Sequence, residues 1–239
     1  MKLSALIIFL FAIMNVTDKS NYLQASEPLL HYLAREPKIK SDHPPLIILL
    51  HGIGSNEQDL FSFADQLPGK YLVISARAPN VLGPNSFAWY HADFSKENPV
   101  INKEQEEKSR SIIIQFIAQL KEKYHFDDKQ VYLVGFSQGA IMSYSIGLTR
   151  PDLVKGIAIM SGRILDNIKP FVASNEKLKH LNVFISHGTN DNVLKIQNAR
   201  NGKAYIEQLG IHPTYKEYAE GHGINQDNLS DLINWLNKQ

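Results

Sequence analysis

The 239-residue sequence contains no cysteine. This absence excludes disulfide bonds, a thiolate nucleophile and any metal site that is built on cysteine. It does not decide the compartment, because a domain with one large core can be exported without disulfides.

The chain also lacks an excess of charge of either sign. It has 25 lysines and arginines against 24 acidic residues, a formal net charge of +1. The charges are scattered and form no basic stripe, so we expect no nucleic-acid partner. Hydrophobic residues make up 44% and charged residues 21%, which is typical of a globular protein. A chain of this length suits one α/β domain.

A long hydrophobic run is absent as well. The apolar stretch Leu3–Met14 has about a dozen residues, whereas a membrane-spanning helix needs about 18 or more. We therefore expect no stable membrane span in the mature domain. Because Lys2 precedes this short apolar stretch and polar residues follow it, the segment resembles a secretory signal peptide.

Residues 1–25 are accordingly predicted to be a signal peptide, with residues 26–239 as one folded domain. The best cleavage site follows Ala25, although Leu23 stands where a small residue is preferred. An uncleaved N-terminal anchor is the alternative. The location that we expect is secreted or periplasmic, and lipoprotein anchoring is excluded because no cysteine follows.

From about residue 28, short β-type runs alternate with helical patterns. This order predicts one α/β domain with a mostly parallel central sheet flanked by helices. The predicted strands are Leu46–Leu50, Tyr71–Ser75, Val131–Val134, Gly156–Met160, Val183–Ser186 and Thr214–Tyr218. The predicted helices are Lys103–Tyr124, one that begins near Ala140, and one at the C-terminus with Leu229, Leu232, Ile233 and Leu236 on one face.

The motif Gly135-Phe136-Ser137-Gln138-Gly139 lies between a predicted strand and a predicted helix. A serine in such a tight turn needs small residues two positions away on each side, because strand and helix approach closely there. The turn would lift the Ser137 hydroxyl above the sheet edge. The alternative role for Ser137 is that of a simple helix N-cap.

A serine hydroxyl needs a base to remove its proton, and in this arrangement the acid and then the base follow the serine. Asp191 lies in the loop after the strand Val183–Ser186. His222 lies between two glycines, after the strand Thr214–Tyr218. We therefore predict Ser137 as nucleophile, His222 as general base and Asp191 as the acid that orients it. Asp191 could instead cap a following helix.

Other acids and histidines fit these roles less well. Asp127 and Asp128 precede the serine, which is the wrong order, and Glu220 adjoins the histidine too closely. His51 and His187 sit at strand ends, where we expect them to shape the site rather than act as bases. No metal-binding spacing of histidines and carboxylates is present, so no metal and no cofactor are expected.

The developing oxyanion of an acyl-transfer reaction is stabilised by backbone N–H groups. One usually follows the nucleophile, and the other comes from the loop after an earlier strand. These positions are Gln138 and Ile53, and Ile53 lies within the glycine-containing loop Leu50–Gly54.

Together these motifs resemble the phospholipase/carboxylesterase family of α/β-hydrolases, which includes the acyl-protein thioesterases. The resemblance covers roughly residues 44–238. It rests on the segments Leu49–Leu60 (LLHGIGSNEQDL), Phe87–Tyr90 (FAWY), Val131–Ala140 (VYLVGFSQGA), Ser186–Asp191 (SHGTND) and Gly221–Ile224 (GHGI).

The resemblance implies an α/β-hydrolase fold and hydrolysis of carboxylic esters or thioesters through an acyl-enzyme. It implies the triad and oxyanion amides named above, and it makes Trp89 an aromatic residue beside the acyl site. The alternative for Trp89 is a half-buried loop anchor. Only about twenty residues, Gly162–Leu181, separate two predicted strands, so we expect no large lid domain.

The function predicted is a serine carboxylesterase that hydrolyses small or medium-chain esters, with a small-molecule ester or a lipid-like molecule as substrate. A lysophospholipase, an acyl-thioesterase, a plant-wall ester deacylase and, less favoured, a peptidase share this chemistry. A non-catalytic binding module on a hydrolase scaffold is the alternative from another class.

Overall fold

The computed structural model describes residues 27–93, 95 and 99–239. The predicted signal peptide or anchor, residues 1–25, therefore lies outside the described residues. Within the described part, no helix has the length and apolar character needed to cross a bilayer.

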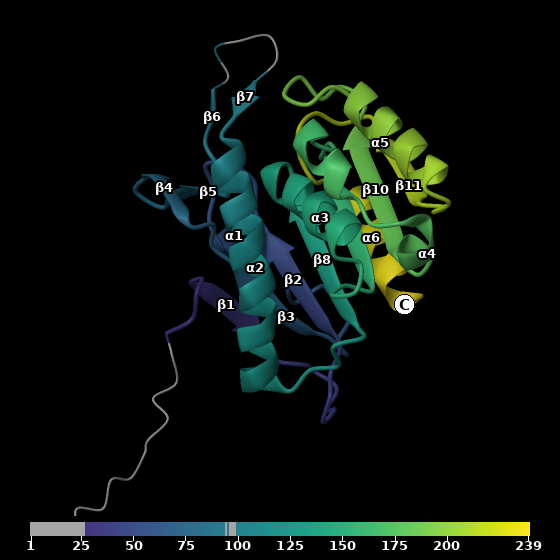
Figure 1. Cartoon of the computed structure of the whole chain (residues 1–239). Helices are drawn as coiled ribbons and strands as arrows, with labels where there is room; N and C mark the ends of the chain where they lie inside the picture. Colours follow the sequence, from purple (N-terminus) through teal and green to yellow (C-terminus); the bar gives the residue numbers. More distant parts are fainter. Residues whose placement is uncertain (1–26, 94, 96–98) are drawn as a thin grey trace, which may run out of the picture.

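A seven-stranded sheet forms the centre of the molecule (Figure 1). Its strands in spatial order are β1 (Tyr32–Arg35), β3 (Leu72–Ala76), β2 (Leu46–Leu50), β8 (Val131–Phe136), β9 (Gly156–Met160), β10 (Asn182–Gly188) and β11 (Thr214–Tyr218). All neighbouring pairs are parallel except β1 with β3 at the edge. The predicted mostly parallel sheet is confirmed.

The central strands of the sheet are apolar without interruption, so helices must cover both faces of the sheet. All five residues of β2 are buried, and alternate side chains point to opposite faces. Leu46, Ile48 and Leu50 join one hydrophobic core, whereas Ile47 and Leu49 join the other.

The helices divide between these two cores. Helices α2 (Lys103–Tyr124), α3 (Gln138–Thr149) and α5 (Gln197–Gln208) pack on one face. Helices α1 (Gln58–Phe61) and α6 (Gln226–Asn237) pack on the other. Figure 1 shows α2 and α3 in front of the sheet and α6 behind it. This is a three-layer α/β arrangement.

The longest helix has the bounds that the sequence predicted, Lys103–Tyr124. It begins at Asn102, whose side chain accepts a hydrogen bond from the Gln105 amide at 3.1 Å. It ends at His125, which adopts a left-handed conformation with φ 52°. Local capping therefore sets both ends of the helix.

Other elements differ from the prediction. Strand β3 is shifted by one residue, and β8 and β10 are longer than expected. Strand β1 and two small hairpins were not predicted, because strands of two to four residues carry too little alternation. The hairpins consist of β4 (Asn80–Gly83) with β5 (Ser86–Ala88), and β6 (Ala92–Asp93) with β7 (Val100–Ile101).

The segment between β9 and β10 is short. It contains only a 3₁₀ helix (Asp166–Phe171) and the four-residue helix α4 (Asn175–Leu178). The expectation of no large lid is therefore confirmed.

The order of the strands places a crevice at one point of the sheet edge. After β2 the chain adds β3 on one side, and it then returns to add β8 on the other side of β2. The loops that leave the carboxyl ends of β2 and β8 diverge at this point, which is where open α/β sheets bind ligands. Ile53 and Ser137 belong to these two loops.

Candidate active site

Ser137 occupies a strained turn between β8 and α3. Its backbone has φ 52° and ψ −114°, a conformation rarely adopted by residues other than glycine. A Cβ atom at Gly135 would lie 2.3 Å from the Gly139 backbone, and one at Gly139 would lie 1.9 Å from the Leu50 carbonyl oxygen. Both glycines are therefore required by close backbone contacts on either side of the serine.

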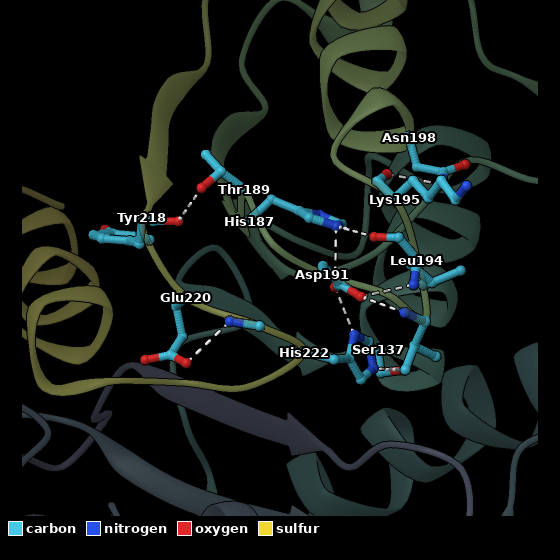
Figure 2. Close-up of polar contacts among 12 residues, drawn as sticks. Ser137, His187, Thr189, Asp191, Leu194, Lys195, Asn198, Tyr218, Glu220 and His222 are labelled. Carbon is cyan, nitrogen blue, oxygen red and sulfur yellow. Dashed lines mark hydrogen bonds and ion pairs between the residues drawn. The ribbon is translucent and has the colours of Figure 1, made fainter.

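The three predicted triad side chains form one hydrogen-bonded chain (Figure 2). The Ser137 Oγ atom lies 2.9 Å from His222 Nε2. On the other side of the ring, His222 Nδ1 lies 2.6 Å from Asp191 Oδ2. The Asp191 side chain is fully buried and that of His222 is 17% exposed. This geometry lets the imidazole take a proton from the serine while the carboxylate holds the ring.

The Asp191 carboxylate has donors on both oxygens. Its Oδ1 atom accepts the backbone N–H groups of Val193 and Leu194, each at 2.8 Å. These bonds close a local turn, and α5 begins only at Gln197, so Asp191 is not the N-cap of that helix. The two amides fix which oxygen faces His222.

His187 adds a further contact to this acid. Its Nε2 atom lies 3.2 Å from Asp191 Oδ2 and also hydrogen-bonds the Leu194 carbonyl oxygen. Because a carbonyl oxygen only accepts, His187 Nε2 carries a hydrogen in this arrangement. The sequence placed His187 near the site, and the structure shows that it contacts the acid directly (Figure 2).

The His222 loop packs directly on the end of β10. A Cβ atom at Gly188 would lie 2.2 Å from the Gly221 carbonyl oxygen, so only glycine fits there. The backbone N–H of Asn190 donates a hydrogen bond to the backbone carbonyl oxygen of Glu220 at 3.0 Å, which joins the two loops. The Glu220 carboxylate accepts from the Gly221 amide and is turned away from His222 (Figure 2). Glu220 is therefore not placed to act as the acid.

His51 is buried and neutral. Its Nε2 atom accepts the Ala78 amide at 3.0 Å, and its Nδ1 atom lies 2.7 Å from the Gly52 carbonyl oxygen. Burial lowers the pKa of His51, which keeps the ring uncharged. Both ring nitrogens are occupied, so His51 holds the loop after β2 and has no free nitrogen for Ser137.

The amides of Ile53 and Gln138 are available at the cavity beside Ser137. Ile53, Ser137 and Gln138 line this cavity together. Neither backbone N–H group donates a hydrogen bond to an acceptor among the described residues. Gln138 is the first residue of α3, where backbone N–H groups have no partner within the helix. Two such donors beside the serine suit an oxyanion.

The predicted substrate-contacting role of Trp89 is not supported. Trp89 has no exposed surface, and its Nε1 atom donates to the His51 carbonyl oxygen at 3.0 Å. Its backbone N–H donates to the Gln138 side chain at 2.7 Å. Trp89 is therefore a buried anchor that joins the loop after β2 to the start of α3. The next residue, Tyr90, lines the cavity instead.

The cavity beside Ser137 is small, about 50 Å³. Its walls are mostly apolar and come from the β6–β7 hairpin, α3 and the turn after Asp191. The described lining residues are Ile53, Tyr90, Ala92, Pro99, Ile101, Ser137, Gln138, Ile141, Arg163, Val193 and Leu194. Sequence reasoning missed Tyr90 and Arg163, although the position of Arg163 just after strand β9 is a signal for a site residue.

Metal ligands do not gather at this site. In the part of the chain that the structure describes, no group of three or more histidine and acidic side chains is arranged to hold a metal ion. The polar groups present are those of acyl transfer by a serine.

Comparison with known proteins identifies the family. The profile of the family described as Phospholipase/Carboxylesterase matches residues 36–239. The chain belongs to this family. The resemblance seen in the motifs is thus confirmed.

Two curated relatives illustrate the range of the family. Acyl-protein thioesterase 1 of Kluyveromyces lactis is 26% identical over 213 residues, which cover 81% of this chain and 91% of the relative. The Arabidopsis thaliana protein named "Probable carboxylesterase SOBER1-like" is 29% identical over 112 residues. That match covers 46% of this chain and 43% of the plant protein, so the chain spans less than half of this relative's length.

Solved structures share the fold. The structure of esterase PE8 is 26% identical, with a TM-score of 0.75, and the match covers 87% of this chain and 98% of PE8. A Bacillus cereus carboxylesterase matches with a TM-score of 0.76 at 22% identity, over 87% of this chain and 94% of that one. The predicted α/β-hydrolase fold is confirmed. By family and fold the chain is a serine hydrolase that acts on carboxylic esters.

Proposed function

We propose that this protein is a serine carboxylesterase that hydrolyses small or medium-chain esters through an acyl-enzyme. The observation that carries the proposal is the hydrogen-bonded chain from Ser137 Oγ through His222 to Asp191, with distances of 2.9 and 2.6 Å. The strained backbone of Ser137 presents this hydroxyl at the carboxyl end of the sheet.

In the acylation step, Ser137 Oγ attacks the ester carbonyl carbon while His222 Nε2 takes the hydroxyl proton. The negative charge on the carbonyl oxygen is stabilised by the amides of Ile53 and Gln138. One such donor contributes on the order of 100- to 1,000-fold in rate. When the tetrahedral intermediate collapses, the bond to the alcohol breaks and His222 returns the proton to the leaving oxygen.

In the deacylation step, water takes the place of the alcohol. His222 removes a proton from this water, the resulting hydroxide attacks the acyl carbon, and the bond to Ser137 Oγ breaks as the serine regains a proton. The Asp191 carboxylate stabilises the imidazolium that forms in each half-reaction. His187 and the amides of Val193 and Leu194 hold this carboxylate in place.

The size of the cavity supports a short acyl or alcohol group. Its volume of about 50 Å³ is well below that of sites that enclose drug-sized ligands. The side chains of Val100 and Val193 are 51% and 59% exposed, so a longer chain would lie along the surface beside these residues.

Active-site labelling tests the assignment of the nucleophile. A fluorophosphonate should add to the protein in a one-to-one ratio, and peptide mass mapping should place the adduct on Ser137. The variant Ser143→Ala is a suitable control, because Ser143 is buried in α3 with its hydroxyl bonded to the Gly139 carbonyl oxygen. Labelling that persists in Ser137→Ala would overturn the assignment.

Acyl thioesters are a second substrate class. The match to an acyl-protein thioesterase, which spans 91% of that relative, supports testing them. The same triad would serve, since only the leaving atom changes from oxygen to sulfur. Rates on matched pairs, butyryl ester against butyryl thioester, separate the two: a higher kcat/KM for the ester supports a carboxylesterase, and the reverse supports a thioesterase.

We also propose that residues 1–25 direct export of the protein. The short apolar stretch after Lys2 supports this role. The test is the N-terminal sequence and fractionation of the protein expressed from its full-length gene. A mature chain outside the cytoplasm that begins near residue 26 supports cleavage. A full-length chain in the membrane fraction supports an anchor, and one in the cytosol contradicts export.

A further inference from the structure

Arg163 differs in its charge from the other residues around Ser137. It lies in the loop three residues after Met160, the last residue of β9, and Met160 is paired with Phe136 next to Ser137. Arg163 is the one charged residue among the described residues that line the Ser137 cavity. The mechanism proposed above does not use it.

The guanidinium of Arg163 has no acceptor in the described part of the chain. Its Nε atom is buried without a hydrogen-bond partner. Asp166, three residues further on, pairs with Lys169 at 2.7 Å and interacts with Arg163 only through space, without a hydrogen bond. Buried donors without acceptors are rare in native proteins because desolvation is costly. An external acceptor would remove this cost.

The acidic groups near Arg163 do not supply a hydrogen-bond acceptor for it. Burial raises the pKa of Tyr90, although the positive charge of Arg163 opposes this shift, so the phenol stays neutral. Glu106 is buried nearby, but its two oxygens accept hydrogen bonds from Ser145 Oγ at 2.7 Å and Asn167 Nδ2 at 2.9 Å. No described carboxylate therefore hydrogen-bonds the guanidinium of Arg163, which leaves its donors for a ligand.

We propose that Arg163 binds a carboxylate of the substrate, so that the preferred substrates are small esters carrying a free carboxylate. This inference rests on the proposed esterase function of Ser137. The planar guanidinium matches a carboxylate with two parallel hydrogen bonds. Because the cavity holds only about 50 Å³, the anion must be compact and close to the ester bond.

A second cavity adjoins Arg163 and offers room for a polar group. Arg163 also lines a larger cleft of about 470 Å³, between the 3₁₀ helix and α5. Polar residues of this cleft include Asn198 and Asn201. The same cleft is also lined by Asp166 and Lys169, so its surroundings are polar.

Matched acid and amide substrates test the proposal. One pair carries the group on the alcohol side close to the ester oxygen, acetoxyacetate and acetoxyacetamide. The other pair carries it on the acyl side close to the ester carbonyl, monoethyl succinate and its monoamide. In at least one pair, the wild type should favour the acid in kcat/KM by about 10- to 100-fold at low ionic strength, with most of the effect in KM.

The variants Arg163→Gln and Arg163→Lys separate charge from packing. Arg163→Gln should abolish the acid preference, and Arg163→Lys should keep part of it, because the charge remains while the paired hydrogen bonds are lost. Lys129→Gln is the matched control: it removes one positive charge at an exposed position before β8, at the opposite end of that strand from Ser137. Thermal unfolding checks that each variant folds.

The outcomes distinguish the two proposals. Wild-type enzyme that hydrolyses the amides but shows no acid preference in either pair would overturn the role of Arg163 and leave the esterase intact. An acid preference that survives in folded Arg163→Gln would overturn it as well. If the wild type hydrolyses none of these esters and no nitrophenyl ester, the esterase function fails, and the role of Arg163 fails with it.

Discussion

Replacing Asp191 by Asn probes the coupling between the acid and the base. The amides of Val193 and Leu194 both donate to Oδ1 at 2.8 Å, so the oxygen of the new amide must occupy that side. Turning the amide over would set its NH₂ group against two N–H donors and lose two hydrogen bonds, about 1 kcal/mol each or more. The NH₂ group is therefore held against His222 Nδ1, where Oδ2 now lies, and only the longer 3.2 Å contact with His187 Nε2 is lost.

This orientation forces the wrong tautomer of the base. Because the new NH₂ group donates, His222 Nδ1 must accept, and the ring proton moves to Nε2. That atom lies 2.9 Å from Ser137 Oγ and can no longer take the serine proton. We expect kcat to fall by about 10⁴-fold, which corresponds to about 5 kcal/mol of transition-state stabilisation. The fold should remain, because both backbone bonds to Oδ1 persist.

The assay is turnover of 4-nitrophenyl acetate together with thermal unfolding. Asp128→Asn is the matched control, since Asp128 is an alternative acid in the sequence and its side chain is 68% exposed. A folded Asp191→Asn variant with kcat within tenfold of the wild type would refute the role of Asp191. A large loss of kcat in Asp128→Asn would indicate that Asp128, and not Asp191, is the acid of the triad.

Three further predictions follow from the same structure. The rate should rise with pH to a plateau, because a general base acts only in its unprotonated form, and a pH profile without such a limb would contradict general-base catalysis. Glu57→Gln should lower the free energy of unfolding by about 2 kcal/mol near pH 7, because it removes the charge and one of the two oxygens that accept the 2.6 Å hydrogen bonds from Arg77. Burial alone would raise the pKa of Glu57, but Arg77 outweighs it and holds the pKa below the ordinary 4.5. The stabilisation is therefore fully present above pH 4.5 and is lost as the pH falls through the pKa of Glu57 in the folded protein. Urea unfolding of the two proteins should give free energies that converge in acid. A difference that stays constant with pH would refute this. Gly139→Ala should cost more than about 4 kcal/mol, since its Cβ would lie 1.9 Å from a carbonyl oxygen, whereas Gly83→Ala, with open space at that position, should be nearly neutral in thermal unfolding.

Local chemistry made some of this structure predictable. The helix Lys103–Tyr124 was predicted at both ends because its caps and charges are encoded within its own segment. The motif around Ser137 was predictable because two glycines are needed where the backbones of β8, α3 and β2 nearly touch. The buried strand Leu46–Leu50 was predictable from its unbroken apolar run.

Contacts between distant segments explain what the sequence did not indicate. Trp89 and Tyr90 are adjacent in an irregular segment, and the contacts of Trp89 with His51 and Gln138 decide which of them faces the cavity. The contact of His187 with Asp191 depends on a turn that is closed by two backbone amides. Arg163 reaches the cavity because β9 lies beside β8 in the sheet. The periodicity of the sequence does not predict any of these contacts, because each joins segments that are irregular or distant along the chain.

The most direct test of the proposed chemistry is turnover of 4-nitrophenyl esters from acetate to palmitate, with wild type beside Ser137→Ala. We predict that the wild type prefers the short esters, in keeping with a cavity of about 50 Å³, and that Ser137→Ala loses activity on all of them. Equal activity in a folded Ser137→Ala variant, or no activity in the wild type on any chain length, would contradict catalysis by this serine.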